Sequence, residues 1–182
     1  MAKRIETRLD GLVLIEPDVY GDERGFLVET YRRDCWRDLG VDLDFVQHNH
    51  SRSAQGTLRG LHFQTAPGQA KLVRCSQGRI FDVAVDLRRG SETFGEWEGH
   101  ELDDHAHRQL LIPIGFGHGF CVLSEQADVD YQLSSYYDGQ TEAGIAWDDP
   151  EVGIEWPVDE PILSERDSSA PRLADVAGEL PF

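Results

Sequence analysis

The stretch Leu58-Arg59-Gly60-Leu61-His62-Phe63-Gln64 is the segment around which we build the interpretation of this chain. Its apolar residues are typical of a buried strand, yet it carries an arginine and a histidine three residues apart. Because successive side chains of a strand alternate between its two faces, packing alone does not explain both residues. We therefore expect an anionic group and an acidic proton to meet the chain here.

The length and the cysteines set the general class of the protein. A chain of 182 residues suits one domain with a sizeable core. Cys35, Cys75 and Cys121 are an odd number without the spacing of metal ligands, and the N-terminal residues do not form a signal peptide or a membrane helix. We expect a protein of the reducing cytoplasm.

The charge balance restricts the possible partners. A formal net charge of -17 disfavours nucleic-acid and anionic-membrane binding, since both need a basic face. Small anionic ligands stay possible where arginines cluster. Lys3 and Lys71 are the two lysines of the chain, and a compact ammonium supports chemistry that a guanidinium does not, so Lys71 is a candidate functional residue.

Short apolar or alternating runs, separated by glycine-rich turns, indicate an all-β domain. The predicted strands are residues 11–16, 26–31, 44–52, 58–64, 71–75, 78–86, 95–102, 109–112, 120–123 and 128–137. One short helix is predicted at residues 32–39, ended by Gly40, and the acidic, proline-rich tail is expected to wrap over the domain and end in one short helical turn. This pattern favours a jelly roll or a related barrel with an open mouth.

Four polar residues on separate predicted strands could meet in that mouth. An antiparallel return after the turn at residues 65–68 would bring Lys71 alongside His62. Three glycines surround His118 and allow a close approach of backbone or ligand. Tyr131 lies on a further strand, although a strand tyrosine more often packs and bonds a carbonyl group.

The strand at residues 44–52 has two polar faces. Gln47 and Asn49 share one face and could bind a polar ligand ring, because buried amides need hydrogen-bond partners. His48 and His50 share the other face, where they could chelate a metal if another strand supplied further ligands, or could be surface histidines.

A series of motifs in this order resembles the dTDP-4-dehydrorhamnose 3,5-epimerase family, over residues 11–171. The motifs are Asp22-Glu23-Arg24-Gly25, residues 47–53, 58–64, 70–75, 81–86 and 113–120, Tyr136-Tyr137, and Gly153-Ile154-Glu155-Trp156-Pro157.

The resemblance implies a cupin-type jelly roll with a few short helices, as a single domain 1–182 with the jelly roll at about 11–157 and a C-terminal wrap at 158–182. It implies a homodimer that inverts two carbons of a dTDP-linked 4-keto-6-deoxy sugar without metal or other cofactor. Many metal-binding cupins carry His-x-His where this chain has His62-Phe63-Gln64, which further disfavours a metal.

The chemistry of the implied reaction fits the candidate residues. Carbons 3 and 5 flank the C4 ketone, so loss of either proton gives an enolate that needs a base, an oxyanion stabiliser and an acid. By resemblance, His62 is the base, Asp167 orients it, and Lys71 stabilises the enolate. His118 contacts the sugar, and Tyr131 returns the proton from the opposite face.

The resemblance also implies a substrate-binding set. Guanidinium groups suit phosphate oxygens, so Arg59 faces the diphosphate, with Arg24 and Arg166 as helpers. Tyr137 stacks on the thymine, and Arg24 also reaches into the neighbouring subunit's site. The remaining members are Phe26, which reaches into that site too, Glu29, Gln47 and Asn49, which bond the nucleotide, and Glu142.

Three departures from the family pattern, at His48, Ile114 and Gln132, fall outside the residues assigned to chemistry. Relatives that invert a single carbon share the catalytic set, so inversion of only C3 or only C5 stays open. Two other classes are alternatives: a metal-dependent cupin using His48, His50, His62 and His118, and a sugar-nucleotide-binding module without catalysis.

Overall fold

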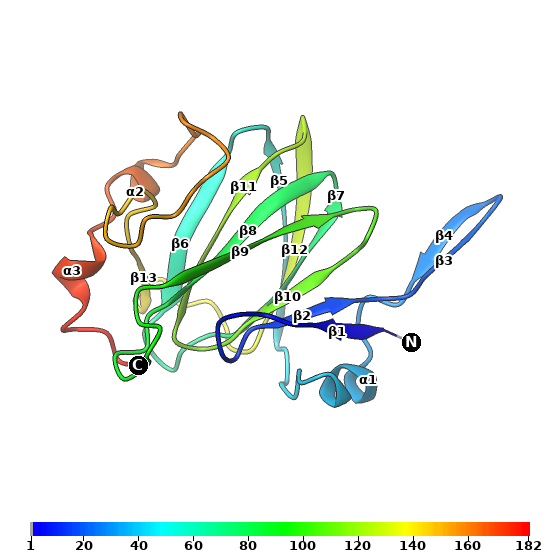
Figure 1. The fold of residues 1–182 in the computed structure, drawn as a ribbon, viewed down its shortest axis with the longest axis horizontal. Coiled ribbons are helices and arrows are strands. Elements are labelled where there is room, and N and C mark those ends of the chain that lie inside the picture. The colour runs from blue at the N-terminus through cyan, green and yellow to red at the C-terminus, as the bar shows by residue number, and fades with distance from the viewer. Residues whose placement is uncertain (1) are drawn as a thin grey trace.

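The computed structural model describes residues 2–182, which form two antiparallel β-sheets packed against each other (Figure 1). The six-stranded sheet has the order β1 (Lys3–Ile5), β2 (Val13–Glu16), β10 (Gln109–Ile112), β7 (Lys71–Gln77), β12 (Gln126–Leu133) and β5 (Gln47–Ala54). The five-stranded sheet has the order β13 (Glu142–Gly144), β6 (Leu58–Gln64), β11 (Phe116–Val122), β8 (Arg79–Asp86) and β9 (Trp97–Asp103). The predicted all-β, cupin-type jelly roll is confirmed.

The main hydrophobic core fills the space between the two sheets. Val73 and Leu110 enter it from the six-stranded sheet, and Ile80 and Phe120 enter it from the five-stranded sheet. These residues alternate along their strands with side chains that face outward, as the period of two predicts. Removal of this apolar surface from water is the main driving force that holds the sheets together.

Within the described residues, three short helices lie outside the sandwich. The first, α1 (Arg33–Asp38), was predicted, and Gly40 follows it with a φ of 107°, which a residue with a side chain rarely adopts. The tail carries two helices, α2 (Glu165–Ser168) and α3 (Leu173–Val176), so the prediction of one helical turn is wrong. The break between them lies at Pro171, which removes a backbone donor.

Several strand boundaries differ from the prediction. Strand β11 begins at Phe116 and runs through the glycines that the sequence suggested would precede it, while β12 ends at Leu133. The turn expected at residues 20–25 is a hairpin of β3 (Val19–Asp22) and β4 (Gly25–Val28), which projects away from the body (Figure 1). Strands β1 and β13, each of three residues, were not predicted.

Strands β6 and β7 do not form the antiparallel pair that the sequence suggested. They lie in different sheets, with β6 beside β11 and β13, and β7 between β10 and β12. The connection after Gln64 therefore crosses the sandwich instead of folding back as a hairpin. Lys71 still meets His62, because its Nζ donates to the His62 carbonyl oxygen at 3.3 Å from the opposite sheet.

A register shift in the β6–β11 pair explains how Arg59 and His62 reach the same cavity. His118 is opposite His62 and Phe120 is opposite Arg59, so three steps along β6 match two steps along β11. The strands approach closely here, since a Cβ on Gly60 would lie 2.5 Å from the Cα of Gly119. The irregularity breaks the alternation of faces and directs the side chains of Arg59 and His62 into the same cavity.

Hydrogen bonds hold the C-terminal tail along the open end of the sandwich, which we call its mouth. Thr57 and Ile162 form a parallel bridge, in which the Leu58 N–H donates to the Ile162 carbonyl oxygen at 3.0 Å. This bridge places the beginning of α2 beside β6. None of the helices in residues 2–182 has the length and the apolar character needed to span a membrane.

Candidate active site

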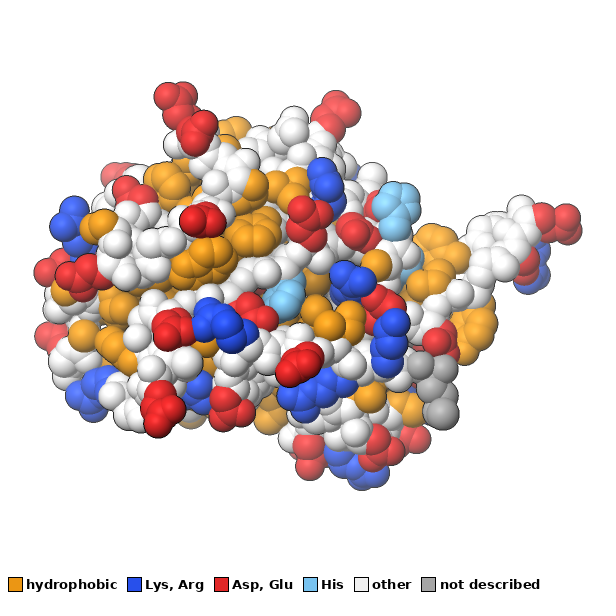
Figure 2. Space-filling model, viewed as in Figure 1, with side chains coloured by type: hydrophobic (Ala, Val, Ile, Leu, Met, Phe, Trp, Pro, Cys, Tyr) orange, Lys and Arg blue, Asp and Glu red, His pale blue; other side chains and the backbone are white. Residues whose placement is uncertain are grey.

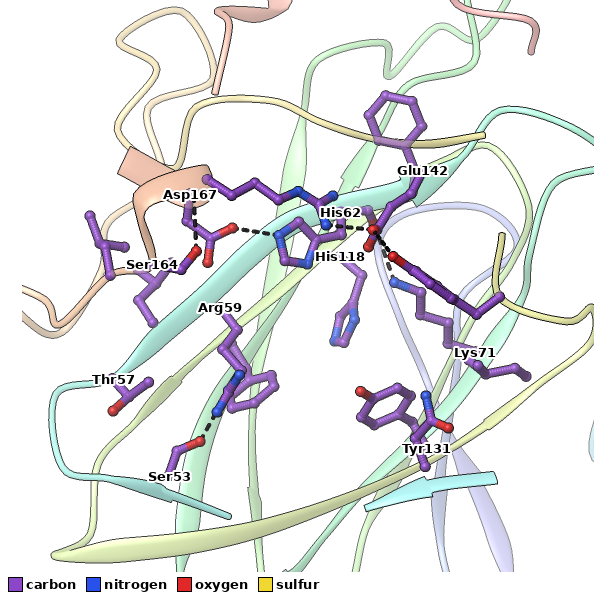
Figure 3. A pocket seen from close by; sticks show the side chains of 18 of the residues that line it. Ser53, Thr57, Arg59, His62, Lys71, His118, Tyr131, Glu142, Ser164 and Asp167 are labelled. Carbon is purple, nitrogen blue, oxygen red and sulfur yellow. Dashed lines mark hydrogen bonds and ion pairs between the residues drawn. The ribbon is translucent and has the colours of Figure 1, made fainter. Parts of the chain in front are cut away.

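A cavity of about 800 Å³ opens between the sheets at this mouth. Strands β5, β6, β7, β11 and β12 supply its walls, and the tail closes one side (Figure 3). It collects most of the residues expected from the sequence, namely Gln47, Asn49, Arg59, His62, Lys71, His118, Tyr131, Tyr137, Glu142, Arg166 and Asp167.

His62 and Asp167 form a histidine–carboxylate pair. The His62 Nε2–H donates to Oδ1 of Asp167 at 2.6 Å, which leaves Nδ1 as the basic nitrogen. Ser164 caps α2 by accepting the Asp167 N–H at 3.1 Å, so the position of the carboxylate is set by the helix. Burial acts to raise the pKa of Asp167, but the hydrogen bond and charge of His62 outweigh it and hold that pKa below its ordinary value. Asp167 is therefore suited to stabilise an imidazolium.

A second histidine–carboxylate pair lies deeper in the cavity. His118 faces His62 across the β6–β11 pair, and its Nε2–H donates to Oδ2 of Asp82 on β8 at 3.0 Å. Burial lowers the pKa of His118, against the opposing effect of Asp82. In a neutral ring held in this way, Nδ1 can accept a hydrogen bond from a hydroxyl group in the cavity.

Lys71 presents its ammonium to the same space from the six-stranded sheet (Figure 3). Burial lowers its pKa to about 8, against the charges of Glu142 and Asp82, which favour the protonated form. A partly desolvated ammonium is a strong stabiliser of negative charge, because the local dielectric constant is low.

Tyr131 faces His62 from the other side of the cavity. It pairs with Asn49 on β5 and with Val73 on β7, and its ring packs against the main core. The sheets thus hold the tyrosine and the histidine on opposite walls (Figure 3).

Polar side chains continue the cavity towards its outer end. The Arg59 Nε–H donates to the Ser53 hydroxyl oxygen at 3.1 Å, which orients the guanidinium. Gln47 donates to Asn49 at 2.9 Å and accepts the Tyr137 N–H at 2.9 Å. Gln47 and Asn49 therefore share one face of β5, as predicted, and this face lines the cavity.

The rim of the cavity carries a three-residue cluster. The Tyr137 hydroxyl donates to Oε2 of Glu142 at 2.8 Å, and Arg166 pairs with the same oxygen at 2.5 Å. The hydrogen bond to Glu142 raises the pKa of Tyr137. Glu142 thereby connects the loop after β12 with helix α2.

Three of the expected residues lie outside this chain's cavity. Arg24 and Phe26 are on the β3–β4 hairpin, and Glu29 follows it. Figure 2 shows that the hairpin projects from the body with charged side chains at its tip. Arg24 pairs with Asp22 at 2.5 Å, while Glu29 pairs with Arg32 at 3.5 Å.

The histidines considered for a metal site do not converge. His48 and His50 lie on the outer face of β5, where His50 Nδ1 bonds Asp130 at 2.8 Å, whereas His62 and His118 lie in the cavity. Within residues 2–182, no group of three or more His, Cys, Asp or Glu side chains could hold a metal ion.

Three contributing residues were not singled out from the sequence. Asp82 holds His118, Ser53 orients Arg59, and Ser164 caps the helix of Asp167. Asp82 had a detectable signal, because a carboxylate in the apolar run Phe81-Asp82-Val83-Ala84-Val85 must have a partner when buried. The two serines had none, since their roles depend on tertiary contacts.

Comparison with known proteins gives a consistent result. The profile of the dTDP-4-dehydrorhamnose 3,5-epimerase family matches residues 6–175. An enzyme of that name from Methanothermobacter thermautotrophicus is 50% identical over 166 residues, 90% of each chain. A dTDP-4-dehydrorhamnose 3-epimerase from Streptomyces niveus is 44% identical over 177 residues, 95% of this chain and 86% of the relative.

A solved structure has the same fold throughout. The crystal structure of a dTDP-6-deoxy-D-glucose-3,5-epimerase from Legionella pneumophila Philadelphia 1, in complex with dTDP-4-keto-L-rhamnose, superposes with a TM-score of 0.95 at 46% identity and covers 99% of this chain and 97% of its own. This chain is therefore an epimerase and belongs to the dTDP-4-dehydrorhamnose 3,5-epimerase family.

Proposed function

We propose that this enzyme converts dTDP-4-dehydro-6-deoxy-glucose to dTDP-4-dehydro-L-rhamnose, by cofactor-independent epimerisation at C3 and C5, in dTDP-L-rhamnose biosynthesis. The observation that carries the proposal is the position of the His62–Asp167 pair across the cavity from Tyr131 (Figure 3). Inversion needs a base on one face of the sugar ring and an acid on the other, and these two walls provide them.

The proposed steps use four side chains. His62 removes the proton next to the C4 ketone, and Asp167 stabilises the imidazolium that forms. Lys71 stabilises the enolate oxygen as negative charge develops there. Tyr131 then gives a proton to the opposite face of the same carbon. His62 releases its proton to solvent and the Tyr131 phenolate takes one up from solvent, after which the same steps occur at the second carbon.

The nucleotide end of the substrate fits the outer part of the cavity. Arg59, helped by Arg166, carries the charge needed for a diphosphate, and both line the cavity. Tyr137 is 54% exposed at the rim, which leaves its ring free to stack on a thymine base. Gln47 and Asn49 supply amide donors and acceptors beside it.

We also propose a homodimer, in which the β3–β4 hairpin reaches a second copy. Tyr20, Phe26 and Leu27 on the hairpin are 63%, 60% and 71% exposed, more apolar surface than a projecting hairpin normally leaves in water. Arg24 and Phe26 would then complete the neighbouring cavity, and Glu29 would lie at the junction. Sedimentation of the parent and of Leu27→Asp tests this proposal, and loss of the dimer in the variant is the expected result.

A cytoplasmic location is part of the proposal. Cys35, Cys75 and Cys121 are free thiols in the described chain, and two of them are buried. Unpaired buried thiols suit a reducing compartment.

The decisive experiment is turnover of dTDP-4-dehydro-6-deoxy-glucose in heavy water, with NMR detection of deuterium at C3 and C5. Incorporation at both carbons, together with reduction to a rhamnose product by an added reductase, is expected. The rate of deuterium incorporation should be at least about 100-fold lower in His62→Asn than in the parent. No incorporation by the parent protein would exclude the proposed reaction and favour a binding module.

A single-centre epimerase is the second candidate, because the Streptomyces niveus relative is named a 3-epimerase. The same NMR experiment separates the two reactions. Deuterium at C3 alone, with C5 unlabelled after many turnovers, would identify a single-centre enzyme.

A further inference from the structure

We propose that Glu142 acts through Lys71: its carboxylate holds the Lys71 side chain in the charged form that stabilises the enolate, and the ion pair with Arg166 limits this effect. The inference rests on the proposed role of Lys71 in catalysis. Glu142 is then a positioning residue that acts through the charge of Lys71, in addition to any contact it makes with the substrate.

The first argument is the poor solvation of the Lys71 ammonium. Its Nζ donates to the His62 carbonyl oxygen at 3.3 Å, and no carboxylate within residues 2–182 forms a direct ion pair with it. A buried ammonium without a counter-ion loses its proton readily, because burial disfavours the charged form. The charge of Lys71 therefore depends on anions at somewhat longer range.

The second argument is the place of Glu142. Strand β13 lies against β6, with Glu142 opposite Gln64, and this brings the carboxylate into the upper part of the cavity. Figure 3 shows the carboxylate of Glu142 and the ammonium of Lys71 directed towards the same space. The Glu142 side chain is only 16% exposed, so water screens its field weakly.

The third argument is the balance of charges around Lys71. Glu142 contributes the largest favourable charge to the Lys71 ammonium and Asp82 the next, whereas Arg166 opposes them. The charged or titratable groups that face this space from the surrounding elements are Arg52 on β5, Arg59 and His62 on β6, Asp82 on β8, His118 on β11, Tyr131 on β12, Tyr137 after β12, Glu142 on β13, and Arg166 and Asp167 on α2.

The fourth argument is the way Glu142 is held. The Tyr137 hydroxyl donates to Oε2, and Arg166 forms an ion pair with the same oxygen. The hydrogen bond from Tyr137 and the ion pair with Arg166 hold the carboxylate in place, yet Arg166 also cancels part of its field. Removal of Glu142 and removal of Arg166 should consequently shift the pKa of Lys71 in opposite directions.

The small number of lysines makes a direct test practical. Protein labelled with ¹³C at lysine Cε gives two lysine signals, from Lys71 and from the exposed Lys3, which pairs with Glu16 at 2.7 Å. The variant Lys3→Arg leaves the Lys71 signal alone and assigns it. The pH titration of this signal measures the protonation of the Lys71 amine and does not depend on enzyme activity.

The expected results have opposite signs. Glu142→Gln should lower the pKa of Lys71 by roughly one pH unit below the parent value of about 8, and Arg166→Gln should raise it. Glu142→Asp, which keeps the charge, should restore most of the parent value. The control Glu165→Gln removes an exposed carboxylate next to Arg166 on the same helix and should leave the titration unchanged.

The alkaline limb of kcat against pH should follow the NMR titration in each variant. If Glu142→Gln and Arg166→Gln move the Lys71 titration in the same direction, or leave it unchanged, Glu142 has only a structural role and the inference is wrong. If Glu142→Gln does not fold, the exposed Arg166→Gln decides alone through the sign of its shift. Titrations that move as expected while kcat does not follow would instead overturn the proposed catalytic role of Lys71.

Discussion

His62 and Asp167 are joined by a 2.6 Å hydrogen bond, although one lies on a strand of the sandwich and the other on a short helix of the tail. This bond fixes the tautomer of His62 and places its basic nitrogen towards the cavity. The proposed catalytic base is therefore supported by a segment that contributes no strand to either sheet.

Asp167→Asn should lower kcat by about 100-fold while KM changes little, because the amide leaves the imidazolium without its compensating charge. Steady-state kinetics give both constants. Ser164→Ala is the matched variant, since it removes the cap of the same helix and keeps the carboxylate. A large rise in KM for Asp167→Asn, with kcat unchanged, would assign Asp167 to binding instead.

Tyr131→Phe should uncouple proton removal from inversion. The base and the enolate stabiliser stay in place, so the proton next to the ketone is still lost and can return from His62 to the face it left. Heavy-water NMR should detect exchange at C3 or C5 with retained configuration. Inverted product formed at the parent rate would show that another group is the acid.

Gly60→Ala should destabilise the protein by about 3 kcal/mol, because the new Cβ would collide with the backbone of Gly119. Urea unfolding measures this loss. Gly56→Ala is the control: its φ of 76° is also positive but no atom lies near its Cβ, so only about 1 kcal/mol of backbone strain is expected. Equal decreases in unfolding free energy in both variants would show that the collision with Gly119 adds nothing to the strain of a positive φ.

Asp86 should contribute stability that disappears in acid. Burial acts to raise its pKa, but hydrogen bonds from Arg88, Ser91 and Thr93 outweigh burial and lower it to about 2. A folded-state pKa below the ordinary 3.8 means that the stabilisation is complete above a pH of about 4 and is lost as the pH falls towards 2.

The difference in unfolding free energy between the parent and Asp86→Asn should consequently shrink by about 2 kcal/mol between neutral pH and a pH of about 2. Urea titrations at several pH values check this, with Asp42→Asn as the exposed control. A difference that stays constant over this range would contradict the low pKa of Asp86.

Strand periodicity predicted most of the sandwich and the inward face of β5, because alternation records which side chains are buried. It could not assign Lys71 to a sheet, since the same alternation suits a hairpin return and a crossover, and only packing separates them. It also could not explain how Arg59 and His62 share a face, because the register shift depends on the glycines of two strands. The second helix of the tail was missed because each helix has four residues and depends on tertiary contacts.

Residue patterns alone pointed to most of the cavity residues, and resemblance added Asp167, Tyr137, Glu142 and Arg166, while the side chains that support them were not anticipated. Asp82 was predictable in principle as a carboxylate in a buried strand. The link from Tyr137 through Glu142 to Arg166 joins three segments far apart in sequence, and local patterns contain no information about such contacts.

The division of the cavity between the two sheets has a consequence for stereochemistry. The proposed base lies on the five-stranded sheet and the proposed acid lies on the six-stranded sheet. The distance between them is therefore set by the distance between the two sheets. Core residues such as Ile80 and Val73, which do not line the cavity, set that spacing. The configuration of the product then depends on the packing of the core. Changes in core volume offer a route by which an enzyme of this fold could gain or lose the second inversion.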